Sequence, residues 1–131
     1  MTKEAAGFTV LLVDDSKSIR HSTQMLLKES GHSVSLAADG FEALCQLASV
    51  NPDIILMDIM MPRLDGFQTC ALIKHHSQFN KIPIVLMSAS DDLVDRIKAE
   101  MVGAQRYITK PFSRNDLLMT LRELLPAQAQ A

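Results

Sequence analysis

Five residues with chemically active side chains follow short apolar segments of this sequence. Asp14 and Asp15 follow the first segment, Asp58 the third, Ser88 the fourth and Lys110 the fifth. Three carboxylates that lie close together repel one another, and a hard divalent cation relieves the repulsion because it prefers oxygen ligands. We therefore expect Asp15 and Asp58 to bind Mg²⁺ or Mn²⁺, with Asp14 in support or binding through water.

Asp58 has a second expected role, as a nucleophile. A carboxylate can form an aspartyl phosphate, and phosphoryl transfer depends mainly on positioning and on neutralising the equatorial oxygens. The cation would bind one oxygen and the Lys110 ammonium a second. The Ser88 hydroxyl and the backbone N–H of Ala89 would donate to the third, and the backbone carbonyl of Met60 would give the cation another ligand.

Each residue also has an ordinary structural interpretation. Asp14, Asp15 and Ser16 could cap a helix, since Asp and Ser are preferred N-cap residues. Ser88 alone fits a turn hydroxyl, and Lys110 alone fits a solvated surface lysine. Asp58 is harder to explain in this way, because it ends an apolar strand where an unpaired charge is costly. The joint pattern at four strand ends favours a functional site.

Five β–α repeats would position these residues. Strands are expected over 8–13, 33–37, 53–57, 82–87 and 105–109. Segments 10–13 and 54–57 are apolar without alternation, which is typical of parallel strands buried on both faces. The sequence therefore predicts an α/β fold, a doubly wound five-stranded parallel sheet covered by helices on both sides. In such sheets ligands bind at the carboxyl ends of the strands, and a cis bond at Lys110-Pro111 would aim the lysine inward.

The intervening segments have helical periodicity. Phe67–His75 is one of them, and Gly31, Asn51-Pro52, Gly103 and Pro126 predict where the others end. In these others, the residues that share a face are Ile19, Thr23, Leu26 and Leu27; Phe41, Leu44, Cys45 and Ala48; Leu93, Ile97 and Met101; and Leu117, Leu121, Leu124 and Leu125. Cys45 and Cys70 lack metal-site spacing and are expected to be small core side chains.

The bulk properties fit one domain. The chain has 131 residues, 47% hydrophobic and 21% charged, with a net charge of -2, and domains typically have roughly 100–150 residues. A nearly neutral chain disfavours nucleic-acid binding, and no apolar run approaches the ~20 residues of a membrane span. We expect a cytoplasmic protein with one domain over residues 8–126 and flexible ends at 1–7 and 127–131.

Four motifs carry a family resemblance over about Thr9 to Leu125. Val-Asp-Asp-Ser at 13–16, Met-Asp-Ile-Met-Met-Pro at 57–62 followed by Asp-Gly, Met-Ser-Ala at 87–89 and Thr-Lys-Pro-Phe at 109–112 resemble the response-regulator receiver family in order and spacing. The resemblance implies a flavodoxin-like (βα)5 fold with strand order 2-1-3-4-5. It also implies that a histidine kinase phosphorylates Asp58 in a two-component phosphorelay.

The resemblance further implies a switch. Ser88 and Tyr107 match the family's hydroxyl and aromatic positions, and phosphorylation would reshape the face formed by the fourth helix, fifth strand and fifth helix. Output would pass by protein–protein contact, and the chain would not be an enzyme beyond weak self-phosphorylation and self-dephosphorylation. Met60 and Ser90, two residues after Asp58 and Ser88, cannot orient an attacking water strongly, so the phosphoryl lifetime stays open.

The stretch from Asp58 to Lys74 is similar to stand-alone receivers of type IV pilus twitching-motility systems. That similarity implies a chemotaxis-like histidine kinase upstream and control of pilus extension downstream. The main alternative is a phosphorylation-independent interaction domain with a receiver-like fold. A haloacid-dehalogenase-type phosphatase would need a second Asp where Met60 stands, and a flavin carrier would need a phosphate loop where Asp14 and Asp15 stand.

Overall fold

The computed structural model describes residues 7–125. Most of the predicted flexible ends (1–6 and 127–131) and the predicted helix stop at Pro126 lie outside the described residues. The strands are β1 (Thr9–Val13), β2 (Ser33–Ala37), β3 (Ile54–Asp58), β4 (Ile84–Ser88) and β5 (Arg106–Thr109). The helices are α1 (Lys17–Glu29), α2 (Gly40–Val50), α3 (Gly66–Lys74), α4 (Leu93–Met101) and α5 (Arg114–Leu124). Within residues 7–125, none of the helices has the length and hydrophobicity that a membrane span requires.

The strands form one sheet of order β2-β1-β3-β4-β5, and every neighbouring pair is parallel. The predicted fold class and strand order are both confirmed. β1, β3 and β4 lie inside the sheet and are almost entirely buried, whereas the edge strands β2 and β5 are partly exposed. This difference explains why only the inner strands have unbroken apolar sequences.

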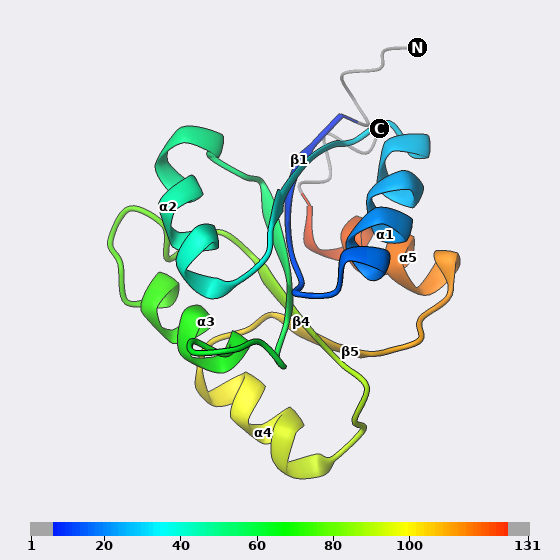
Figure 1. The fold of residues 1–131 in the computed structure, drawn as a ribbon. Helices are drawn as coiled ribbons and strands as arrows, with labels where there is room; N and C mark the ends of the chain where they lie inside the picture. Colours follow the sequence, from blue (N-terminus) through cyan, green and yellow to red (C-terminus); the bar gives the residue numbers. More distant parts are fainter. Residues whose placement is uncertain (1–6, 126–131) are drawn as a thin grey trace.

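The helices cover the sheet from two sides (Figure 1). Alternate residues of each inner strand enter opposite cores, so Leu11 and Val13 pack with α2, α3 and α4. Val10 and Leu12 pack with α1 and α5. The two cores hold the sheet rigidly between the helix layers, and its carboxyl edge therefore presents the strand-end residues in fixed positions.

The rotation of α2 about its axis differs from what the sequence pattern suggested. Its buried residues are Gly40, Ala43 and Leu47, whereas Phe41 is 49% exposed and Cys45 is exposed. A Cβ at Gly40 would lie 2.2 Å from the Thr69 Oγ1 atom of α3. The small residues thus allow α2 to approach α3 closely, and this contact turns Cys45 outward. The expectation that Cys45 is a core side chain is wrong.

The two thiols should differ strongly in reactivity. Cys70 is fully buried, and burial raises the pKa of its thiol to about 11, so little of the reactive thiolate forms near neutral pH. We expect iodoacetamide to alkylate Cys45 in the native protein and Cys70 only after denaturation, as measured by peptide mass spectrometry. Cys45→Ser is the control and should leave the native protein unmodified. Equal alkylation rates for the two thiols would contradict this burial pattern.

Candidate functional site

The carboxyl edge of the sheet gathers the residues that the sequence pattern selected. Asp14 follows β1, and Lys110 follows β5. Asp58 and Ser88 are the last residues of β3 and β4, which corrects the expectation that they stand just after the strands. The register pairs Asp58 with Met87 and Ser88 with Thr109, so neighbouring strands end at nearly the same level.

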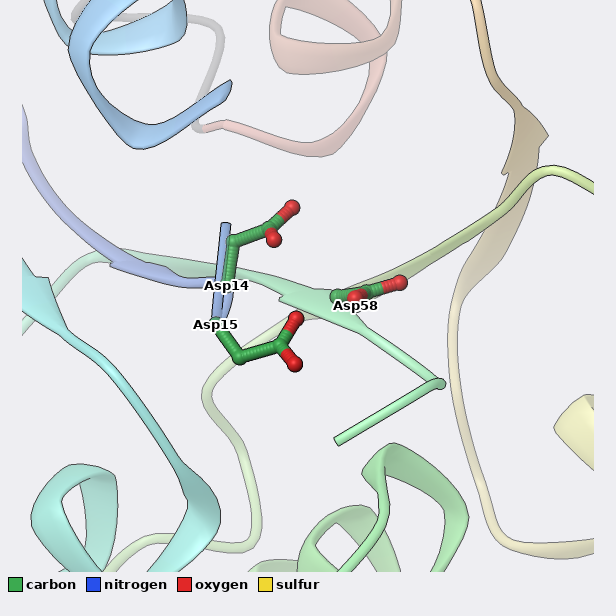
Figure 2. Close-up of side chains that lie close together, drawn as sticks. All are labelled: Asp14, Asp15 and Asp58. Atoms are coloured by element: carbon green, nitrogen blue, oxygen red, sulfur yellow. The ribbon is translucent and has the colours of Figure 1, made fainter. Parts of the chain in front are cut away.

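Figure 2 shows the Asp14, Asp15 and Asp58 carboxylates converging from the β1 end and the β3 end of the sheet. One ligand oxygen from each carboxylate lies within 4.8 Å of the others. Asp14 is 0% exposed and Asp58 is 4% exposed, whereas Asp15 is exposed. Two of the three carboxylates are therefore shielded from solvent, and the third, that of Asp15, lies on the solvent-exposed side of the cluster.

Lys110 joins the two buried carboxylates. Its Nζ atom lies 3.0 Å from Asp14 Oδ2 and 3.3 Å from Asp58 Oδ1, and its side chain is only 15% exposed. The Lys110-Pro111 peptide bond is cis, the arrangement that the sequence analysis considered for aiming the lysine inward. The interpretation of Lys110 as a solvated surface lysine is therefore wrong.

The pKa values of Asp58 and Lys110 are both raised. Burial raises the pKa of the Asp58 carboxyl, the Asp14 charge raises it further, and Lys110 and the Met60 backbone N–H oppose the shift only in part. Burial alone would lower the pKa of the Lys110 ammonium, but its hydrogen bond to Asp14 and the charges of Asp58 and Asp14 outweigh burial, and that pKa is raised.

The loop after β1 fixes Asp14 in place. Asp14 Oδ1 accepts a hydrogen bond from the Ser16 backbone N–H at 2.9 Å, and the Asp14 carbonyl accepts one from Arg20 Nη1 at 2.6 Å. The N-cap of α1 is Ser16. Ser16 therefore caps the helix, as one interpretation of the sequence suggested, and the two aspartates do not. Their carboxylates belong to the cluster instead.

Glycine is required beside Asp58, where α3 begins. A Cβ at Gly66 would lie 2.4 Å from the Asp58 carbonyl oxygen and 2.7 Å from the Ile59 Cα atom, and both are backbone atoms that cannot move aside. The N-cap Asp65 forms a capping box with Gln68. Together these features hold the loop from Ile59 to Asp65 close to the end of β3.

A cleft of about 780 Å³ opens over the cluster. Most of the predicted site residues line it, and they are Asp14, Asp15, Asp58, Met60, Ala89 and Lys110. The sequence analysis missed Phe67, Asp95 and Lys98, which also line it. Asp95 and Lys98 belong to α4, and their charge and spacing resemble those of any exposed helix face. Only the tertiary fold identifies them.

Ser88 and Tyr107 are connected through the loop between β4 and α4. Ser88 is 2% exposed, and its Oγ atom accepts a hydrogen bond from the Ser90 backbone N–H at 3.0 Å. The Tyr107 hydroxyl donates to the Ser90 carbonyl at 2.6 Å. The two predicted switch residues therefore contact the same residue, Ser90, one at its backbone N–H and the other at its carbonyl.

The donor set fits a hard divalent cation. Its side-chain donors are all carboxylate oxygens, and within residues 7–125 the Asp15 carboxylate has no hydrogen bond or ion pair in the structure. One ammonium, that of Lys110, pairs with two of the three carboxylates. Mg²⁺ in proteins is typically held by one or two carboxylates and keeps several waters, which suits a cluster with one solvent-facing member.

Comparisons with known proteins agree with this geometry. The family described as "Response regulator receiver domain" matches residues 10–122. The chain is 46% identical to Protein PilG of Pseudomonas aeruginosa over 127 residues, which cover 97% of this chain and 94% of PilG. By contrast, it spans only 50% of a mycobacterial response regulator to which it is 40% identical.

Solved structures give the same result. Chemotaxis protein CheY4 of Vibrio cholerae superimposes with a TM-score of 0.87 at 35% identity, covering 92% of this chain and 100% of CheY4. The receiver domain of sensor histidine kinase PA1611 from P. aeruginosa, solved with magnesium coordinated in its active-site cleft, superimposes with a TM-score of 0.84 at 31% identity, covering 91% of this chain and 98% of that domain. The chain belongs to the response-regulator receiver family.

Proposed function

We propose that the chain accepts a phosphoryl group from a histidine kinase on the Asp58 carboxylate and signals through protein–protein contact. The observation that carries the proposal is the Lys110 ammonium between the buried Asp14 and Asp58 carboxylates, 3.0 and 3.3 Å away. This arrangement presents a nucleophile and a fixed cation at one open cleft, which is what phosphoryl transfer requires of a protein.

In the proposed reaction, an Asp58 carboxylate oxygen attacks phosphorus while the bond to the donor atom breaks, and the donor leaves with that electron pair. Lys110 neutralises charge on the transferring group. The Ser88 hydroxyl and the Ala89 backbone N–H donate hydrogen bonds to its oxygens. Asp15, Asp58 and the Met60 carbonyl would hold Mg²⁺, with Asp14 in support, and when bound this ion supplies electrostatic stabilisation of the phosphoryl oxygens.

Asp15 offers a sharp test of the metal site. Because it is exposed and makes no other contact in the described part of the chain, Asp15→Asn should leave stability unchanged while weakening Mg²⁺ binding at least tenfold. Isothermal titration with Mg²⁺ measures the affinity. Intact-mass spectrometry with acetyl phosphate should show one added phosphoryl group on the wild type only when Mg²⁺ is present.

Asp91→Asn is a matched control, because it removes another exposed aspartate that does not line the cleft. Its Mg²⁺ affinity should equal that of the wild type. Equal affinity in Asp15→Asn would contradict the assignment of Asp15 as a ligand. A wild type that acquires no phosphoryl group would favour the alternative, an interaction domain that works without phosphorylation.

The proposed output surface is the face of α4, β5 and α5. The apolar residues of α4 that share a face point to solvent: Leu93 is 68%, Ile97 46% and Met101 79% exposed. Beside them a pocket of about 330 Å³ reaches Tyr107 on β5. Exposed apolar side chains that cluster in this way are typical of a protein-binding surface.

We propose the partner and the pathway from similarity to other receivers. The resemblance of Asp58 to Lys74 to stand-alone receivers of type IV pilus systems, and the match to PilG over nearly its whole length, support pilus motility with a chemotaxis-type kinase upstream. A cytoplasmic location of this chain would give that kinase access to Asp58. The similarity to CheY4, a chemotaxis protein, supports the same class of pathway.

A further inference from the structure

Arg96 on α4 contacts three residues of the switch region, one in the loop after β4 and two on β5. Its guanidinium pairs with Asp91 in the loop after β4. It also lies over the Tyr107 ring, 5.0 Å from the centroid. A third contact reaches Thr109 Oγ1 at the end of β5, at 3.4 Å. One side chain thus connects the loop, the aromatic residue and the strand that precedes Lys110.

The same loop holds the Ser88 hydroxyl. Ser90 donates its backbone N–H to Ser88 Oγ at 3.0 Å and accepts the Tyr107 hydroxyl on its carbonyl at 2.6 Å. Asp92 donates its N–H to Ser90 Oγ at 3.1 Å. A movement of the Ser88 hydroxyl toward Asp58 therefore pulls on Ser90, and through Ser90 on Tyr107 and Asp91.

We propose that Arg96 is a positioning residue that holds the β4–α4 loop and Tyr107 in the arrangement described here, and so opposes the shift of Ser88 toward a phosphoryl group on Asp58. This inference rests on the proposed function. Its physical basis is linkage. Contacts that stabilise the present arrangement, and that are lost in the shifted one, lower the affinity for any ligand that binds only the shifted arrangement. The factor by which the affinity falls equals the factor by which those contacts favour the present arrangement.

The expected effect is moderate. The Arg96 side chain is 43% exposed and its partner Asp91 is 69% exposed, and both exposed ion pairs and exposed cation–π contacts are individually weak. We expect Arg96→Gln to bind the phosphoryl mimic beryllofluoride about fivefold more tightly than the wild type at saturating Mg²⁺. Arg96→Lys, which retains a cation, should lie between the two.

Tyr107 provides the readout. The chain has one tyrosine and no tryptophan, so intrinsic fluorescence reports Tyr107 alone. Titration with beryllofluoride in Mg²⁺ should change this fluorescence, and the midpoint gives the affinity. Asp91→Asn removes the same ion pair from the other partner and should shift the midpoint in the same direction. In the double variant, Asp91→Asn should add little to the midpoint shift caused by Arg96→Gln, because Arg96→Gln alone already breaks the ion pair.

Arg63→Gln is the matched control. Arg63 makes the same two kinds of contact elsewhere, an ion pair with Asp39 at 2.8 Å and a cation–π contact with Phe41 at 5.4 Å, so its midpoint should equal that of the wild type. An unchanged or weaker affinity in Arg96→Gln would overturn the inference about Arg96. A wild type that shows no response to beryllofluoride would instead overturn the proposed function.

Discussion

Asp58→Asn is expected to abolish phosphoryl acceptance. The neutral amide cannot attack phosphorus as a carboxylate does, and Asp14, the other buried carboxylate of the cluster, already accepts hydrogen bonds from Lys110 and Ser16. Intact-mass spectrometry after incubation with acetyl phosphate and Mg²⁺ measures the result. We expect the added phosphoryl group of the wild type to fall below detection in the variant.

The loss should occur without loss of fold. Because burial and the Asp14 charge raise the pKa of Asp58, the folded state binds this proton more tightly than the unfolded state. The stability from protonated Asp58 is therefore present at low pH and is lost as pH rises through the raised pKa. In metal-free buffer at neutral pH, Asp58→Asn should match or exceed the wild type in Tm, and the difference should narrow on acidification.

Asp95→Asn is the matched control, since Asp95 lines the same cleft but lies on α4, outside the carboxylate cluster. It should accept a phosphoryl group at a rate within about twofold of the wild type, as expected for a charge that makes no contact with the cluster. Persistent phosphorylation of Asp58→Asn would show that another residue is the acceptor and would refute the assignment.

Lys110→Met should impair both stability and phosphoryl transfer. It leaves Asp14 and Asp58 without the ammonium that lies 3.0 and 3.3 Å from them, and removing one partner of a buried ion pair typically costs about 3 kcal/mol. Urea denaturation at neutral pH in metal-free buffer measures this loss. The rate of phosphorylation should fall roughly 100-fold or more, because one fixed charge that stabilises the transition state is gone.

Mg²⁺ distinguishes an electrostatic defect from a packing defect. If the loss arises from two uncompensated carboxylates, added Mg²⁺ should raise the Tm of Lys110→Met more than that of the wild type. Lys98→Met serves as control, because Lys98 lines the same cleft but is exposed and lies over the Phe67 ring. Its stability should change by less than about 0.5 kcal/mol. Wild-type stability in Lys110→Met would contradict the bridging role of Lys110.

Much of the fold and the site could be predicted from local sequence signals. The apolar runs at 10–13 and 54–57 indicated buried parallel strands, and they are the inner strands β1 and β3. Parallel strands end at one edge, so polar residues at their carboxyl ends had to converge. The order of the strands came from the family resemblance, because periodicity alone does not specify which strands are neighbours.

The helix faces show where the sequence becomes insufficient. A period of 3.6 identifies residues that share a side of a helix, but the rotation of that side relative to the sheet depends on neighbouring side chains. α2 buries Gly40 and Ala43 against α3 and leaves Phe41 exposed. On α4 the apolar face with Ile97 points to solvent, because only Ala99 of this helix is buried.

The amino-acid sequence by itself determined the five repeats, the residue types at the strand ends and the chemistry that they support. Only the tertiary structure determined that Lys110 contacts Asp14 and Asp58 together, that Asp95 and Lys98 complete the cleft, and that Arg96 stacks on Tyr107. The physical reason is that these contacts join residues from different elements. Their distances depend on how closely the helices pack on the sheet, which no local pattern of residues encodes.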